Sequence, residues 1–168
     1  MIGHNELYHA PDESIESWCF LRLGTAETGQ SIERWEVGFG NSAQLIRTDS
    51  RKVSVDRSEA ALLKELTDDV LDEHRHAEHD LHVITASSST IPLLRTRLLR
   101  NEVDTTFRGV YHISIEEVLE EFFQSDTLGE NHLGHRLDSG DLSVEELWNL
   151  LNRLAPLVPR HTLVGERL

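Results

Sequence analysis

The segment of residues 81–100, LHVITASSSTIPLLRTRLLR, constrains the fold more than any other part of this chain. Residues 82–86 are mostly apolar and rich in β-branched side chains over the length of a buried strand. Small polar residues at 87–90 supply a turn and candidates for a helix N-cap, and Pro92 suits a first helical turn. In residues 93–100, helical spacing puts the leucines on one side of the predicted helix and the arginines on the other. We therefore predict a strand, a tight turn and an amphipathic helix that lies on a sheet.

The other predicted elements extend this unit to a β-β-β-α-β-α order. Strands are predicted over residues 17–23, 33–40, 43–48 and 108–113, with a short edge at Val53 and Val55. Helices are predicted over residues 59–76, over 115–123, and from a capping box at Ser143 to Pro156, with Ser58 and Ser114 as further N-caps and a polar loop at 129–140. This order predicts an α/β fold: one mixed sheet, with its first three strands antiparallel and the later ones parallel, flanked by helices. Residues 1–16 are predicted to form a loose N-terminal arm, and residues 17–168 a single domain.

The charge balance indicates the environment of the protein. The chain has 30 acidic and 16 basic residues, a formal net charge of -14, and its only lysines are Lys52 and Lys64. A carboxylate excess with so few lysines is typical of proteins from extremely halophilic archaea, whose cytoplasm holds molar salt, although an ordinary acidic protein is the alternative. Because a Debye length of about 3 Å at 1 M salt screens repulsion from phosphate, the net charge does not exclude nucleic acid as a partner.

Single residues and segments exclude several classes of protein. The one cysteine, Cys19, excludes an internal disulfide, and its strand-like surroundings predict a buried thiol. No segment has the ~18–20 apolar residues that span a bilayer, and the N-terminal residues lack a signal-peptide pattern, so we expect a cytoplasmic protein without membrane contact. Four histidines, His74, His76, His79 and His82, have a spacing that could bind a transition metal. They straddle a helix end and a loop, which favours solvated side chains instead.

The strand, turn and helix of residues 81–100 resemble the second exonuclease motif of RNase H-like 3′-5′ exonucleases, especially the proofreading domain of family B DNA polymerases and related stand-alone nucleases. In that family the strand runs into T-Y-N, and a short loop precedes F-D-x-P-x-L-x-x-R. Thr85 and residues 91–97 match this frame, although the loop is shorter. Ser87, Ser88 and Ser89 replace the Asn, and Thr90 stands where the family has a metal-binding Asp.

The other motifs of the family are degenerate in the same way. The resemblance implies two Mg²⁺ or Mn²⁺ ions held by acids from three motifs, because hard cations prefer carboxylate oxygens. The first motif, D-x-E, aligns with Arg22 and Gly24, and a shifted alignment retains only Glu27. The third motif, aromatic-x-x-x-Asp on the last helix, aligns with Trp148 and Asn152. The resemblance therefore implies an RNase H-like fold that has kept its scaffold and lost its metal-binding acids.

Two hypotheses for function follow. The first is a non-catalytic module without a cofactor that binds nucleic acid or a protein of DNA or RNA processing, in a groove formed by residues 87–90 with Arg22 and Asn152. In this hypothesis the Arg22 guanidinium points between the strand of Thr85 and the last helix, in place of the lost ions. Arg95 and Arg97 would then reach phosphate, or else pair with carboxylates on a solvated face.

The second hypothesis is a divalent-metal exonuclease that binds Mg²⁺ or Mn²⁺ through non-standard acids. The acids considered are Glu27, Glu36, Asp138 and Asp141. At least three of these carboxylates would have to lie within about 5 Å of a common point. The choice between DNA and RNA, and the oligomeric state, are left open.

Overall fold

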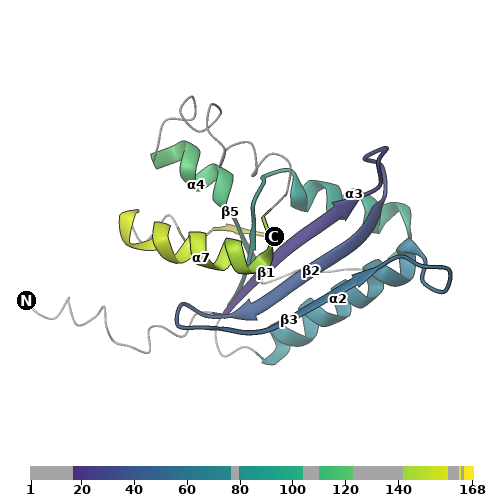
Figure 1. The fold of residues 1–168 in the computed structure, drawn as a ribbon, viewed down its shortest axis with the longest axis horizontal. Helices are drawn as coiled ribbons and strands as arrows, with labels where there is room; N and C mark the ends of the chain where they lie inside the picture. The colour runs from purple at the N-terminus through teal and green to yellow at the C-terminus, as the bar shows by residue number, and fades with distance from the viewer. Residues whose placement is uncertain (1–16, 77–79, 104–109, 123–141, 159–162, 164) are drawn as a thin grey trace, which may run out of the picture.

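A computed structural model describes residues 17–76, 80–103, 110–122, 142–158, 163 and 165–168. Its centre is a six-stranded sheet with the strand order β3-β2-β1-β4-β5-β6 (Figure 1). The strands are β1 (Ser17–Thr25), β2 (Ile32–Gly40), β3 (Leu45–Lys52), β4 (Leu81–Thr85), β5 (Tyr111–Ser114) and β6 (Glu166–Arg167). The described helices are α2 (Glu59–His76), α3 (Thr90–Arg100), α4 (Ile115–Phe122) and α7 (Val144–Leu154), followed by the 3-10 turn η2 (Ala155–Leu157).

The strand pairing confirms the predicted mixed sheet. β1 pairs antiparallel with β2, and β2 pairs antiparallel with β3. On its other side β1 pairs parallel with β4, which pairs parallel with β5, and β6 closes the sheet antiparallel to β5. The fold is therefore α/β, with the four described helices flanking a mixed sheet, and its layout is consistent with an RNase H-like arrangement.

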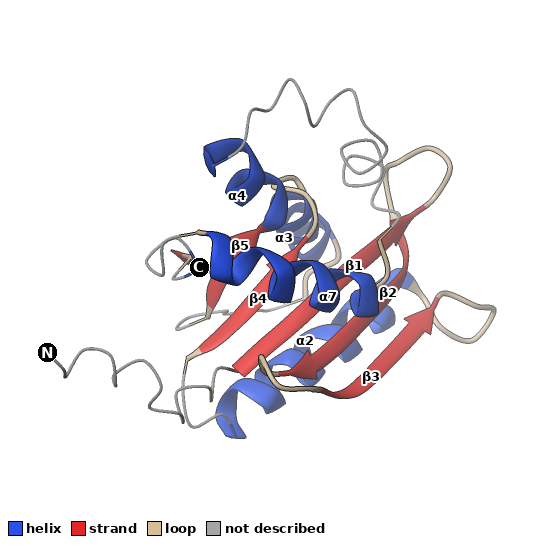
Figure 2. Cartoon of the chain, turned by 60° about the vertical axis from the view of Figure 1, so that its left-hand side comes forward, coloured by secondary structure: helices blue, strands red, loops and turns tan. Residues whose placement is uncertain are grey.

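Different helices cover the two faces of the sheet (Figure 2). Because side chains alternate along a strand, Cys19 and Leu21 of β1 point to one face, and Trp18 and Phe20 point to the other. Helices α2 and α3 bury their apolar side chains against the first face. Helices α4 and α7 pack against the second face. We call these the α2 face and the α7 face.

The predicted caps begin three of the helices. The Ala61 amide donates to Ser58 Oγ over 3.2 Å at the start of α2, and the Glu117 amide donates to Ser114 Oγ over 3.4 Å at the start of α4. Helix α7 begins with the predicted capping box, in which Ser143 and Glu146 each accept a hydrogen bond from the other's backbone amide. Since these bonds satisfy amides that a helix start leaves unpaired, they set where each helix begins.

Several element ends differ from the prediction. β1 continues to Thr25 and β3 to Lys52, because the antiparallel pairing persists well beyond the apolar residues. Val53 and Val55 lie outside the strands, and Val55 is fully exposed. β6 was not predicted, since its two residues carry no apolar pattern. The predicted arm at 1–16 and the loop at 129–140 lie outside the described residues.

No helix in the described ranges is both long and apolar enough to cross a membrane. Helix α2, for example, spans 18 residues but carries acidic side chains along much of its length.

Candidate functional site

The degenerate motif positions map to β1, to the turn after β4 and to α7. The resemblance would put the metal ions between Arg22, Gly24, Thr90 and Asn152, and the α7 face between β1 and β4 leads up to these positions. In that region Phe20 pairs with Ile84 across the parallel strands. Its side chains are all apolar and at least nine-tenths buried: Trp18, Phe20, Ile84, Ala86, Leu147 and Leu151. We call this set the apolar seam. It offers a divalent ion no oxygen ligands.

The serine turn, residues 87–90, is held by a carboxylate that the sequence did not single out. Glu116 Oε1 accepts hydrogen bonds from the Ser88 amide over 3.1 Å and from Ser88 Oγ over 3.0 Å. The Ser87 hydroxyl lies 3.4 Å from the same oxygen and 2.9 Å from Ser89 Oγ, and the Thr90 amide donates to the Ser87 carbonyl. These bonds tie the turn to α4. The hydroxyls of Ser87, Ser88 and Ser89 therefore already have partners within the fold.

The two arginines predicted to reach phosphate have different surroundings. Arg97 forms a charge-assisted pair with Glu59, with a 2.9 Å hydrogen bond from Nε, and both side chains are 15% exposed. Burial raises the pKa of Glu59, but hydrogen bonds from Arg97, from the Ile32 amide and from Asn101 outweigh it and leave the pKa below its ordinary value. Arg97 thus links α3 to α2. Arg95 is exposed on α3.

The third-motif positions serve packing on α7. Trp148 Nε1 donates to the Asn41 carbonyl over 2.9 Å, which ties α7 to the β2–β3 hairpin. Asn152 Nδ2 donates to the Trp148 carbonyl over 2.9 Å, one helical turn back. The two residues therefore form a pair along the helix, as their spacing allows.

A buried polar pair lies between β4 and β5. His112 Nε2 is 2.8 Å from Thr85 Oγ1, and the same hydroxyl donates to the Ser87 carbonyl over 2.9 Å. Because the hydroxyl proton is used for Ser87, the imidazole must donate through Nε2. Burial, and to a lesser degree the charge of Arg95, lowers the pKa of His112 to about 4. This histidine is therefore a neutral structural residue near pH 7.

A basic pocket of about 450 Å³ opens where β1, β2 and β3 extend beyond α7. Five of the 16 basic residues of the chain line it, together with one carboxylate: Arg22, Arg34, Arg51, Lys52, Arg57 and Glu36. The formal charge of these lining side chains is +4, in a chain whose net charge is -14. A concentration of cations against so acidic a background marks this pocket as the candidate binding site.

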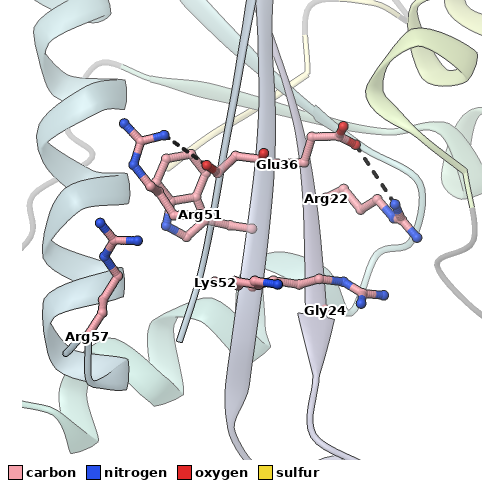
Figure 3. Close-up of a pocket in the computed structure, with 9 residues that line it drawn as sticks. Arg22, Gly24, Glu36, Arg51, Lys52 and Arg57 are labelled. Atoms are coloured by element: carbon pink, nitrogen blue, oxygen red, sulfur yellow. Dashed lines mark hydrogen bonds and ion pairs between the residues drawn. The ribbon is translucent and has the colours of Figure 1, made fainter. Parts of the chain in front are cut away.

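Arg22, the degenerate first-motif position, lies on the α7 face as expected, but its ion pair is with β2. The Arg22 guanidinium is 3.9 Å from Glu36 Oε1, its neighbour in the antiparallel register (Figure 3). The same oxygen accepts from the Val144 amide over 3.3 Å, at the first residue of α7. The sequence predicts this guanidinium against the serine turn and Asn152. In the structure, the carboxylate directly across the strand pair is an ion-pair partner of Arg22.

The cations around the pocket divide into two groups. Arg51 and Arg57 point to the α2 side of the strands (Figure 3), where Asp49 and Glu65 are their ion-pair partners. Arg34 and Lys52 belong to the α7 face, and no carboxylate in the described ranges forms an ion pair with either. Their charge is therefore available to a ligand.

The acids of the exonuclease hypothesis are not seen to gather. Glu27 is exposed in the turn after β1, and Glu36 is engaged with Arg22 and α7. Asp138 and Asp141 lie outside the described residues. Among the residues that are described, no three His, Cys, Asp or Glu side chains are placed to hold a metal ion.

Cys19 and His82 both pack against neighbouring residues of the fold. Cys19 is fully buried, as predicted, and burial raises the pKa of its thiol well above the ordinary value, so the thiolate is disfavoured. His82 stacks on Tyr111 with ring centroids 5.3 Å apart. The side chains of His76 and His79 lie outside the described part of the chain.

No protein-family model matches this chain, and no curated protein matches it significantly.

Proposed function

We propose that this protein is a non-catalytic nucleic-acid-binding module on an RNase H-like scaffold, and that the basic pocket is its binding surface. The observation that carries the proposal is that five basic side chains line one pocket on a chain of net charge -14. Arg22, Arg51 and Arg57 have carboxylate partners, whereas Arg34 and Lys52 form no ion pair within the described residues. Phosphate groups are the ligands that such a concentration of Arg and Lys suits best.

The residues at the motif positions support binding without cleavage. Phosphodiester hydrolysis by the resembled nucleases needs two hard cations and their oxygen ligands. Arg22 and Gly24, which align with the first motif, offer no carboxylate oxygen, and Arg22 adds a positive charge that opposes a metal ion. The apolar seam of Trp18, Phe20 and Ile84 precedes them on the same face.

The placement of the pocket also supports the proposal. Arg22 is two residues beyond Phe20 on the same face of β1, directly after the seam ends. A strand of nucleic acid that meets the edge of the sheet would contact cations first, without displacing α7. In molar salt the attraction is short-ranged, so close contacts with guanidinium groups, which are weakly hydrated, suit this environment better than diffuse charge.

The test is a binding measurement with a cleavage arm. Short fluorescent single-stranded DNA and RNA are titrated with the protein from the lowest KCl concentration at which it is folded up to molar KCl, with and without Mn²⁺. We expect saturable binding, weakening with salt, and no shortening of the strand. The double substitution Arg34→Ala with Lys52→Ala should weaken binding at least tenfold, since it removes two cations that form no ion pair with the described carboxylates.

The matched control is Arg100→Ala with Arg153→Ala, which removes two exposed cations from α3 and α7 away from the pocket. Both double variants change the net charge equally, so only a local site separates them. Equal loss of binding in the two variants, or no binding by the wild type in any salt, would contradict the proposal. Strand shortening with Mn²⁺ would restore the exonuclease hypothesis.

A further inference from the structure

We infer that the α7-face half of the basic pocket is a seat for a phosphate monoester, the dianionic group at the end of a nucleic-acid strand or on a mononucleotide. The inference rests on the proposed function and specifies its ligand. The seat consists of Arg22, Arg34 and Lys52, which the register brings onto the same side of three strands. Arg22 aligns with Glu36 and Ser50 in one cross-strand row, and Arg34 and Lys52 align with Gly24 in the next.

Gly24 leaves the space that the Arg34 side chain occupies in the seat. A Cβ atom built on Gly24 would lie 2.4 Å from Arg34 Nε and 2.5 Å from Arg34 Cγ, closer than real contacts allow. The Arg34 side chain therefore lies directly over the bare backbone of β1, the strand that carries Arg22. Gly24 is not among the residues with positive φ, so the need for glycine here is one of space. Gly24 stands where the resembled motif has an acidic residue, and in the structure it leaves room for the Arg34 side chain.

The charge of the seat matches a monoester. Three cations and Glu36 give a formal charge of +2, whereas a terminal phosphate carries about -1.5 to -2 near pH 7 and an internal diester carries -1. Glu36 is also held by the α7 amide, and its 3.9 Å separation from Arg22 is longer than a hydrogen bond. The seat keeps an excess of positive charge with the Arg22–Glu36 pair in place, because Arg34 and Lys52 form no ion pair within the described residues.

The lining indicates recognition of phosphate and not of a base. Trp35 is the one aromatic residue among the lining side chains, and it is only 2% exposed. A base would find no open ring for stacking there. The whole pocket, with both sides of the strands taken together, has a volume of about 450 Å³, which falls within the range of small-molecule sites.

The experiment compares one strand with and without a terminal phosphate. The 5′-phosphorylated, 3′-phosphorylated and unphosphorylated forms of the same short DNA are titrated by fluorescence anisotropy, and adenosine 5′-monophosphate and inorganic phosphate serve as competitors. We expect a phosphorylated end to bind about tenfold more tightly than the unphosphorylated strand. Competition by the mononucleotide at concentrations near those of the strand would identify the free nucleotide as a source of the ligand. Competition only at far higher concentrations would identify the strand end.

Substitutions decide whether the preference arises at this seat. Gly24→Ala and Arg34→Gln should each abolish the preference for the phosphorylated end, whereas Thr25→Ala, one residue along β1 and outside the pocket lining, should retain it. Thermal unfolding of each variant checks the fold, and Arg34→Gln keeps the test decisive if Gly24→Ala does not fold.

The outcomes separate this inference from the proposed function. Equal binding of all strand forms, unaffected by Arg34→Gln, overturns the phosphate seat but leaves strand binding in place. Mononucleotide binding that Arg34→Gln abolishes, without binding of any strand, supports the seat and overturns the proposed function. Absence of binding by every probe overturns both.

Discussion

Phe20 and Arg22 lie two residues apart on the same face of β1, yet they belong to regions with opposite properties. Phe20 is fully buried in the apolar seam under α7, and Arg22 lines an open basic pocket. The two regions share one strand, one face and one helix as neighbour. The difference between the two positions is that α7 covers β1 at Phe20 and leaves it open at Arg22. Burial without partners excludes charge at Phe20, whereas contact with water and Glu36 permits it at Arg22.

Glu36 marks the boundary between these regions. Its carboxylate contacts the first amide of α7 and faces the Arg22 guanidinium on the other side. A carboxylate is favourable at a helix N-terminus because of the partial positive charge there. Glu36 therefore lies where the part of the sheet covered by α7 ends and the basic pocket begins. The seam should therefore control stability, and the pocket should control binding.

The largest effect is expected in the seam. Phe20→Ala should lower the free energy of unfolding by about 3–5 kcal/mol, because it removes a fully buried ring and leaves a cavity. Denaturant unfolding at fixed KCl measures the change. A loss below about 1 kcal/mol would mean that α7 does not pack on β1 as described.

The next largest effect is expected on acidification, which should lower the free energy of unfolding through His112. Its folded pKa of about 4 is below the ordinary value of 6.5, so the neutral form stabilises the fold. This contribution is complete above pH 6.5 and is lost as the pH falls from 6.5 to 4, by up to about 3 kcal/mol. Urea unfolding across this range should show the loss, and His112→Gln should flatten that part of the slope. An unchanged slope would contradict a buried neutral imidazole.

The Glu59–Arg97 pair should contribute a smaller amount. Arg97→Ala should cost about 2 kcal/mol, since it leaves a mostly buried carboxylate with fewer donors. The control is Lys64→Ala, whose ion pair with Asp68 is exposed, and which should cost less than about 0.5 kcal/mol. Similar costs for the two variants would show that the Glu59–Arg97 pair contributes no more than an exposed ion pair.

Raising the salt concentration should increase the stability of the fold and weaken binding at the pocket. The net charge of -14 repels itself at low ionic strength, so raising KCl to molar concentration should increase the free energy of unfolding, by about 1 kcal/mol or ~2–4 °C in Tm. Binding at the pocket should weaken over the same range. Calorimetry and anisotropy in matched buffers measure both. A Tm that does not respond to KCl would contradict the halophilic interpretation of the composition.

The smallest effect on stability is expected in the pocket. Arg34→Ala and Lys52→Ala should each change the free energy of unfolding by less than about 0.5 kcal/mol, because both side chains are exposed and without ion pairs in the described ranges. Their effect should be on affinity. A large loss of stability in either variant would assign the pocket cations to the fold instead.

The sequence predicted the elements that periodicity and capping determine. Alternation in β1, the apolar stripe of α2 and the capping box at Ser143 each depend on neighbouring residues, so they can be read from a short window. The strand ends beyond residues 23 and 48 depend on pairing in the hairpin, which local pattern does not contain. β6 is held by backbone bonds to β5 and carries no side-chain signal.

The pocket was missed for the same reason. Its cations are dispersed over residues 22–57, and only the antiparallel register places Gly24 beside Arg34 and Lys52. Individually they look like solvated charges. One signal was present in the sequence: Lys52 is one of two lysines in the chain. Motif alignment directed attention to the serine turn, whose hydroxyls the fold uses to bind Glu116.

The most direct test of the account is an amide chemical-shift map of the protein titrated with a 5′-phosphorylated single strand. We predict that the largest shifts fall on β1–β3 beyond the end of α7, around Arg22, Gly24, Arg34 and Lys52, while amides of the seam and of the serine turn change little. Shifts concentrated at residues 84–90 and on α7, with the β1–β3 region unaffected, would contradict the division of this face into a structural half and a binding half.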